Sequence, residues 1–197
     1  MLGIGLLLAS CLGLSVVIAL HGTQTSVASR PPSESTKPAA LAPPVSTVPN
    51  IGLPSRLVIP KLQIDASVKY MGTTASGEME VPTTIVDVGW YKYGALPGNT
   101  GTAVMAGHID GPKGQPAIFA NISKLQAGDT LSVVDSAGRA TSFVVTGSKV
   151  YEQNEKPQEV FNSSSGAHLN LITCAGDWDS SSRHFLERLV IFTDKAT

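Results

Sequence analysis

The sequence predicts an all-β domain, a barrel or sandwich of short strands, behind an N-terminal apolar segment. Two observations favour this fold class. Compact apolar or alternating runs recur from Ser55 onward, and Pro or Gly separates them at intervals of roughly eight to twelve residues. Helical periodicity is scarce in the same region. The 197 residues, with 42% hydrophobic content and formal net charge −1, allow one sizeable domain with appendages and give no indication of nucleic-acid binding.

The first element is an uncharged apolar run over residues 2–20. At about 1.5 Å per residue, a helix of this length crosses a hydrocarbon layer of about 30 Å. A cleaved signal peptide is a weaker interpretation, because its apolar core is shorter and follows positive charge that is absent here. A lipoprotein box ending at Cys11 is also disfavoured, since the apolar run continues past it. We therefore predict a single transmembrane anchor within residues 1–20.

Residues 21–54 form the second segment, which is rich in Pro, Ser, Thr and Ala and carries only three charges. Such a composition cannot supply a hydrophobic core, and its prolines favour extended polyproline conformations. We expect a semi-rigid spacer between the membrane and a domain over residues 55–197. The basic residues nearest the span, Arg30 and Lys37, lie on its C-terminal side, so charge alone would keep this side cytoplasmic.

The domain begins with strand-like runs, RLVIP, ASVKYM and TAVMAGH. Two β-branched runs between Thr130 and Glu152 surround the turn sequence Asp-Ser-Ala-Gly at residues 135–138, which predicts a hairpin. The best helix candidate is Pro116 to Leu125, with an apolar stripe and Gly128 as its stop.

Two apolar runs with a polar loop between them cover residues 169–192. Cys174 ends the first run, so we expect it at a strand end, where catalytic groups often lie. Arg188 opens the second run. Period-two alternation places Arg188, Val190 and Phe192 on one face, with Leu189 and Ile191 on the other. Without other evidence, a buried apolar cysteine and a snorkelling arginine would explain these residues equally well.

A histidine changes this balance, because His108 ends the apolar strand TAVMAGHID. A thiol, an imidazole and a guanidinium at neighbouring strand ends form a nucleophile with its partners. The other cysteine lies within the apolar span. The soluble part therefore has one thiol and no disulfide, and reactivity explains such a thiol better than crosslinking does.

The informative segments of the domain are AGHID, LITCAGDWD, ERLVIF, RLVIPKLQIDASV, GEMEVP, VGWY and LPGNTGTAVMAGHID. Together they resemble the sortases, which are membrane-anchored cysteine transpeptidases of bacterial surfaces, and most closely the class E and F members of that family. The resemblance covers about residues 54–193. It implies a closed eight-stranded β-barrel with one or two short helices, and a catalytic set of His108, Cys174 and Arg188. It also implies a single-pass protein of the bacterial cell membrane with its catalytic domain outside.

The chemistry of these residue types agrees with that expectation. A thiol attacks a carbonyl as thiolate, which neighbouring positive charge stabilises. Protonated His108 can then donate its proton to a leaving amine. Arg188 keeps its charge and can hold a thiolate, the substrate backbone or an oxyanion. The resemblance implies cleavage of a Leu-Pro-x-Thr-Gly-like sorting signal of surface proteins, a thioacyl intermediate on Cys174, and transfer to a peptidoglycan-precursor or pilin amine.

Several neighbours compete for roles at this site. Arg183 is the alternative arginine, although its polar loop indicates a solvated charge. Relatives in classes E and F often carry the arginine a residue or two away from position 188, which leaves this choice open. Thr173 could shape a substrate-binding pocket. His21, His168 and His184 are expected to be surface or packing residues.

We predict neither metal nor cofactor, because Asp110, Asp177 and Asp179 lack the dense ligand spacing of a calcium loop. Two other functions remain. An L,D-transpeptidase also combines Cys and His on a β-scaffold, but its His lies two residues before the Cys, which this chain does not show. A non-catalytic β-barrel on a membrane stalk would tolerate loss of Cys174.

Overall fold

The structure, a computed structural model, describes residues 52–197. The predicted membrane span at residues 2–20 and nearly all of the predicted spacer lie outside this range. Within residues 52–197, no helix is long and apolar enough to cross a membrane.

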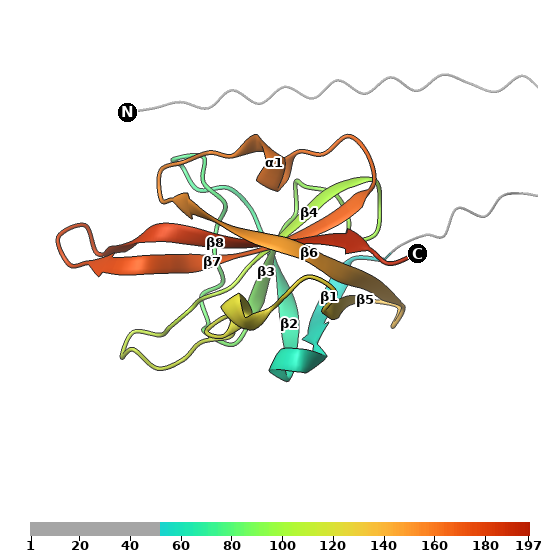
Figure 1. The fold of residues 1–197 in the computed structure, drawn as a ribbon, viewed down its shortest axis with the longest axis horizontal. Helices are drawn as coiled ribbons and strands as arrows, with labels where there is room; N and C mark the ends of the chain where they lie inside the picture. Colours follow the sequence, from blue (N-terminus) through green and yellow to red (C-terminus); the bar gives the residue numbers. More distant parts are fainter. Residues whose placement is uncertain (1–51) are drawn as a thin grey trace, which may run out of the picture. The chain divides into compact units, whose positions relative to one another are not determined.

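Eight strands form the described part of the chain, and they close into a barrel (Figure 1). Around the barrel the order is β1-β2-β3-β4-β7-β8-β6-β5, and β5 pairs back to β1. The predicted closed eight-stranded barrel is therefore confirmed. The strands are β1 (Pro54–Ile59), β2 (Ile64–Met71), β3 (Val88–Tyr91), β4 (Gly101–Ala106), β5 (Thr130–Asp135), β6 (Ala140–Glu152), β7 (Ala167–Asp179) and β8 (His184–Lys195).

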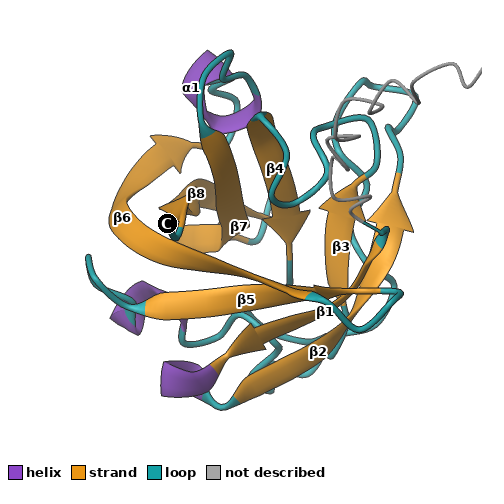
Figure 2. Ribbon diagram, turned by 90° about the vertical axis from the view of Figure 1, so that its right-hand side faces the viewer, coloured by secondary structure: helices purple, strands orange, loops and turns teal. Residues whose placement is uncertain are grey.

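Two of the strand pairs are parallel, β2 with β3 and β4 with β7, and the others are antiparallel (Figure 2). A parallel pair needs a long crossover connection. Between β4 and β7 this connection contains the whole β5–β6 hairpin, which is the hairpin predicted from residues 130–152. The crossover brings the segment after β4 next to the middle of β7, although the two are far apart in sequence.

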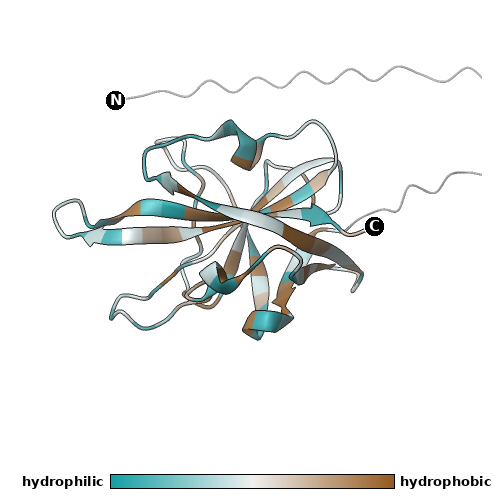
Figure 3. Cartoon of the chain, viewed as in Figure 1, coloured by the Kyte–Doolittle hydropathy of each residue, from teal (hydrophilic) through white to brown (hydrophobic). Residues whose placement is uncertain are grey.

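Alternate positions of strands such as β2 and β5 fill the barrel interior, whereas β3 and β4 are buried along nearly their whole length, and hydrophobic and hydrophilic residues alternate along parts of the barrel wall (Figure 3). Leu189 and Ile191 pack with this interior cluster, whereas Val190 and Phe192 pack in a second cluster with Tyr151. The predicted division of β8 into two faces is thus confirmed. Burying each large apolar side chain contributes roughly 1.5–3 kcal/mol. Fully buried members of the interior cluster include Leu57, Ile59, Ala103, Met105, Phe119, Ile122, Phe143, Leu169, Leu171 and Ile191.

Within residues 52–197, helix is confined to three short segments, η1 (Pro60–Leu62), η2 (Ile122–Lys124) and α1 (Gln158–Phe161). The helix predicted over residues 116–125 is wrong except for its 3-10 turn η2. Its first half is used for other hydrogen bonds: the Ile118 amide donates to Ile85 O at 2.8 Å and the Phe119 amide to His108 O at 2.9 Å. Tertiary pairing with these loops replaces helical bonding.

The hairpin of β7 and β8 is longer than its sequence predicts, and it projects from the barrel at the orange-red tip in Figure 1. The expected polar loop is only four residues long, 180–183, so Cys174 lies within β7 and not at its end. A bulge explains the difference. The register shifts between Ala175 and Trp178, where Gly176 adopts φ +73°, and pairing then resumes at Trp178 and Phe185.

Candidate active site

Cys174 lies on β7 directly opposite Arg188 on β8. Side chains that are directly opposite in an antiparallel pair project from the same face of the sheet. Ile172 and Val190, two residues away on each strand, belong to the cluster outside the barrel core, so Cys174 and Arg188 share that outer face. Cys174 is half-buried and is the free cysteine of the described chain.

His108 follows β4 by two residues, and β4 runs parallel to β7 in a register that pairs Ala106 with Ile172. Two further bonds continue this alignment. The Gly107 amide donates to Ile172 O at 3.1 Å, and the Thr173 hydroxyl donates to Gly107 O at 2.9 Å. Extending the register by two residues brings His108 level with Cys174. Cys174 is therefore flanked by the His108 segment on one side and by Arg188 on the other.

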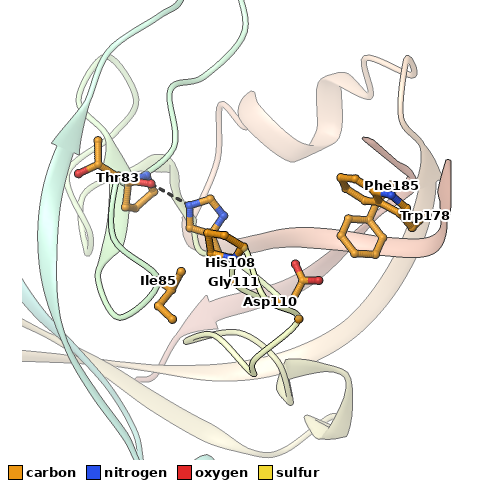
Figure 4. A pocket seen from close by; sticks show the side chains of 10 residues that line it. Thr83, Ile85, His108, Asp110, Gly111, Trp178 and Phe185 are labelled. Carbon is orange, nitrogen blue, oxygen red and sulfur yellow. Dashed lines mark hydrogen bonds between the residues drawn. The ribbon is translucent and has the colours of Figure 1, made fainter. Parts of the chain in front are cut away.

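The ring of His108 is fixed through its Nε2 atom, which lies 2.8 Å from Pro82 O (Figure 4). A carbonyl oxygen only accepts hydrogen bonds, so Nε2 carries the hydrogen in this arrangement. Nδ1 is then the nitrogen that can gain or lose a proton without breaking the bond to Pro82. The loop before β3, which carries Pro82, thus orients the imidazole for proton exchange.

Arg188 is half-buried, and its Nη1 atom donates to two carbonyls of its own strand, Phe185 O at 3.0 Å and Glu187 O at 2.8 Å. Within residues 52–197 no carboxylate forms an ion pair with it. Its positive charge is therefore available to an anion on the outer face of β7. The competing Arg183 is exposed in the hairpin turn at φ +59°, away from this face.

Three effects set the acidity of the Cys174 thiol. Burial raises its pKa most, the Arg188 guanidinium offsets part of this rise, and the Asp110 carboxylate adds to it. Because the net direction is upward, the thiol form predominates at neutral pH in this state. Sequence reasoning expected positive charge alone to decide this equilibrium. It did not anticipate the burial or the nearby carboxylate.

A pocket of about 700 Å³ opens beside His108 (Figure 4). Cys174 and Arg188 are not among its lining residues, so it extends from the histidine side of the site. The β7–β8 hairpin contributes Trp178 and Phe185, whose rings meet edge to face at 5.2 Å. The lining residues are Pro82, Thr83, Ile85, His108, Asp110, Gly111, Pro112, Gly114, Trp178 and Phe185.

Sequence reasoning missed the aromatic pair in this pocket and weighed Asp110 only as a calcium ligand. The missed signal is local: Trp178 and Phe185 flank the hairpin turn symmetrically, as a cross-strand pair does. Within residues 52–197 no three acidic, His or Cys side chains gather as a metal site. Asp179 instead accepts hydrogen bonds from Ser181 in its own turn.

The remaining predicted residues lie away from the thiol. Thr173 is 3% exposed on the inner side of β7, so its contact with the site is the bond to Gly107 O. His168 is held by Asp194 Oδ1 and Ser165 O, each at 2.7 Å. His184 is exposed at the start of β8. His21 lies outside the described residues.

With this geometry in place, comparison with protein families is decisive. A family model described as the sortase domain matches residues 57–196, most of the chain. The chain belongs to the sortase family. Sortases are cysteine transpeptidases, so the barrel domain belongs to that class of enzymes. The L,D-transpeptidase interpretation is therefore set aside.

Solved sortase structures share the fold. Sortase C from Clostridium perfringens SM101 is 21% identical, with a TM-score of 0.54 and coverage of 74% of this chain and 70% of that one. Sortase C-1 from Actinomyces oris is 20% identical, with a TM-score of 0.58 and coverage of 72% and 73%. A lid mutant of sortase A from Corynebacterium diphtheriae is 18% identical, with a TM-score of 0.58 and coverage of 75% and 72%.

Comparison with curated protein sequences gives no match. The similarity to class E and F members stays a prediction.

Proposed function

We propose that this sortase cleaves a Leu-Pro-x-Thr-Gly-like sorting signal with Cys174 as nucleophile, His108 as proton donor and acceptor, and Arg188 as the anion-stabilising group. The observation that carries this assignment is the strand register. Cys174 lies opposite Arg188 on β8, and the parallel pairing of β4 with β7 brings His108 level with the thiol from the other side.

In the first half-reaction, the Cys174 thiol gives its proton to Nδ1 of His108, and the sulfur attacks the carbonyl carbon of the scissile peptide bond. The carbonyl oxygen becomes an oxyanion, and the guanidinium of Arg188, which has no carboxylate partner within residues 52–197, shares the outer face of the sheet with Cys174 and can stabilise it. When the C–N bond breaks, the leaving amine takes a proton from Nδ1 of His108 while Nε2 keeps its bond to Pro82 O. The products are a thioester on Cys174 and a released peptide with a free amino group.

In the second half-reaction, an amine attacks the thioester carbonyl and loses one proton to neutral His108. A C–N bond forms, the C–S bond breaks, and Arg188 meets the developing oxyanion again. The partners proposed for these steps are surface proteins bearing C-terminal sorting signals and a peptidoglycan-precursor or pilin amine. Thr173 acts here as a positioning residue, because its hydroxyl ties β7 to the segment that leads into His108.

The test is covalent. Full-length protein in detergent is incubated with a sorting-signal peptide, and intact mass is measured during turnover. We expect an increment equal to the peptide's N-terminal acyl portion, located on Cys174. Cys174→Ala should lose cleavage entirely while keeping the melting temperature of the wild type. Cleavage of the peptide by Cys174→Ala would refute the mechanism. If the wild type and Cys174→Ala both bind the peptide equally and the wild type does not cleave it, a non-catalytic barrel would be favoured.

Anchoring in the membrane is a further part of the proposal. The uncharged run at residues 2–20 supports a single-pass anchor, and the composition of residues 21–54 supports a spacer that holds the domain outside the cell. Protease added to intact cells should digest the domain. Full protection of the domain until the cells are lysed would contradict the external orientation.

A further inference from the structure

The carboxylate of Asp110 stands without a partner in the pocket beside His108. It is half-buried, and within residues 52–197 no hydrogen bond or ion pair reaches it. Its backbone is well fixed, since Asp110 bridges to Pro116 and the neighbouring Gly111 amide donates to Gln115 O at 2.8 Å. A partly buried carboxylate costs free energy unless something pairs with it.

Most other aspartates of residues 52–197 have a partner: Asp179 accepts hydrogen bonds from Ser181, and Asp177, which has no partner, is exposed to solvent. Asp65, Asp87, Asp129 and Asp135 each pair with a lysine or arginine, and Asp194 pairs with His168. The nearest lysine in sequence, Lys113, forms no ion pair with Asp110. The pocket therefore holds negative charge that the described chain leaves uncompensated.

Opposite this carboxylate, the β7–β8 hairpin presents Trp178 and Phe185. Trp178 is 55% exposed, and the two rings pack edge to face. An exposed tryptophan on an extended hairpin is poorly explained by core packing, because the pair lies beyond the bulge at Gly176 and outside both buried clusters. Figure 4 shows Asp110 between the His108 ring and this aromatic pair.

A carboxylate facing aromatic rings is suited to an organic cation. The carboxylate accepts charge-assisted hydrogen bonds from an ammonium, and aromatic faces attract the same charge. The pocket walls from Pro82, Ile85 and Pro112 are apolar and can contact an aliphatic stem. An anionic ligand would be repelled by Asp110, and a small neutral ligand would leave the charge of the carboxylate uncompensated.

We propose that Asp110, Trp178 and Phe185 bind the acceptor amine of the transpeptidation as a lysine-type alkylammonium. This inference rests on the proposed function. This pocket lies on the His108 side of the active site, where an amine that gives its proton to His108 approaches the thioester on Cys174. Asp110 binds the substrate and is not assigned a covalent step.

The protons balance as follows. The ammonium bound at Asp110 releases one proton to solvent and becomes a neutral amine, whose nitrogen attacks the thioester carbon. The second proton passes to Nδ1 of His108 as the C–N bond forms and the C–S bond breaks. The imidazolium of His108 then returns its proton to the Cys174 thiolate, which restores the starting thiol and neutral imidazole, and no redox partner is needed.

The experiment compares two acceptors, Nα-acetyl-lysine amide and triglycine, with full-length wild type and Asp110→Asn. The matched control is Asp177→Asn, which removes the same charge from an exposed position outside the pocket. We expect Asp110→Asn to raise the KM for the lysine-type amine by at least about tenfold, as loss of a charge-assisted bond implies. Acylation of Cys174 should persist, and the thioester should partition toward hydrolysis.

Trp178→Ala should raise the same KM by a smaller factor, about twofold to fivefold, and Asp177→Asn should match the wild type. The inference is overturned if Asp110→Asn uses the lysine-type amine as well as the wild type does, or if wild type prefers triglycine. If the wild type forms the acyl adduct but Asp110→Asn leaves the KM for the lysine-type amine unchanged, only this inference is contradicted. Absence of the acyl adduct in the wild type sinks the proposed function and this inference with it.

Discussion

The β5–β6 and β7–β8 hairpins have similar turns, but they differ in the long-range hydrogen bonds of the turn aspartate and in the register of their strands. An aspartate closes each turn. Asp135 accepts from the amides of Ala137 and Arg139, and Asp179 accepts from Ser181. Asp135 also binds the Gly52 amide and the Arg139 guanidinium, so the first turn is tied to the start of β1. Asp179 has bonds within its own turn only.

The second difference is the bulge. The β5–β6 pairing runs without a register shift from Thr130 to Val134, whereas β7–β8 shifts between Ala175 and Trp178. The first hairpin therefore stays in the barrel wall and contributes core residues. The second one leaves the wall and lines the pocket with aromatic rings. A hairpin thus acquires a functional surface here through an interruption in its ladder, and not through its turn.

The largest effect that would sharpen this contrast concerns Arg188 in the functional hairpin. Arg188→Ala should lower transpeptidation by about 10²–10³-fold, as expected for loss of an oxyanion-stabilising group, with the melting temperature nearly unchanged. Arg188→Lys should rescue poorly, because a point charge does not reproduce a planar fork of donors. Steady-state cleavage assays measure both.

The control for this prediction is Arg183→Ala in the turn of the same hairpin. Its activity should stay within about twofold of the wild type, since the side chain is exposed and away from the thiol. If Arg183→Ala proves inactive and Arg188→Ala active, the assignment of the catalytic arginine is reversed.

Next in size is a glycine exchange that targets the bulge. Gly176 has φ +73°, and a Cβ there would lie 2.7 Å from Glu187 Oε2, so Gly176→Ala strains the bulge and displaces its neighbour. We expect transpeptidation to fall roughly fivefold to tenfold as the aromatic pair moves. Gly138→Ala is the matched control in the other hairpin, with φ +80° and no atom within 4 Å of the new Cβ.

Both alanine variants should lose a similar amount of stability, about 1 kcal/mol, because both force an L residue into the left-handed region. Only the variant at the bulge should lose activity. Equal activity of the two variants in a cleavage assay would show that the bulge does not shape the site.

In the β5–β6 hairpin, a substitution of the turn aspartate should lower the stability of the fold and leave activity unchanged. Asp135→Asn should lower the melting temperature by roughly 5–10 °C, because a 7%-exposed acceptor of four donors loses its charge and part of its accepting capacity. Asp179→Asn should cost about 2 °C or less. Calorimetry on both variants, with cleavage assays showing retained activity, measures the difference.

The comparison of the wild type with Asp135→Asn should also depend on pH. Backbone hydrogen bonds, with the Arg139 amide first, lower the pKa of Asp135 to about 2. A lowered pKa means that this stabilisation is fully present above the ordinary carboxyl pKa of about 3.9 and is lost as the pH falls toward 2. The gap in melting temperature between wild type and Asp135→Asn should therefore narrow between about pH 4 and pH 2. A gap that is constant across this range would contradict the assigned cause.

The smallest effect concerns the acidity of Cys174, which faces Arg188, His108 and Asp110. Since Asp110 raises the pKa of the thiol, Asp110→Asn should move the pH profile of iodoacetamide alkylation to lower pH. Arg188→Ala should move it to higher pH. Asp177→Asn should leave the profile in place, and a shift in that variant equal to the shift in Asp110→Asn would show that net charge, and not the pocket, is responsible.

Sequence by itself determined the features that depend on local periodicity and turn chemistry. Alternation separated Leu189 and Ile191 from Val190 and Phe192, and the Asp-Ser-Ala-Gly turn located the β5–β6 hairpin. The same reasoning selected Cys174 and His108 as candidates, because each stands at the end of an apolar run. These features are readable because side chains two residues apart share a face whatever the strand's partner.

Only the tertiary structure decided which strands are neighbours. The parallel pairing of β4 with β7 spans a connection of some sixty residues, and it alone brings His108 level with Cys174. The bond from His108 to Pro82 O, the length of the β7–β8 hairpin and the unpaired carboxylate of Asp110 follow from the same closure. Such long-range contacts depend on how all eight strands close together, and no local pattern of residues specifies that.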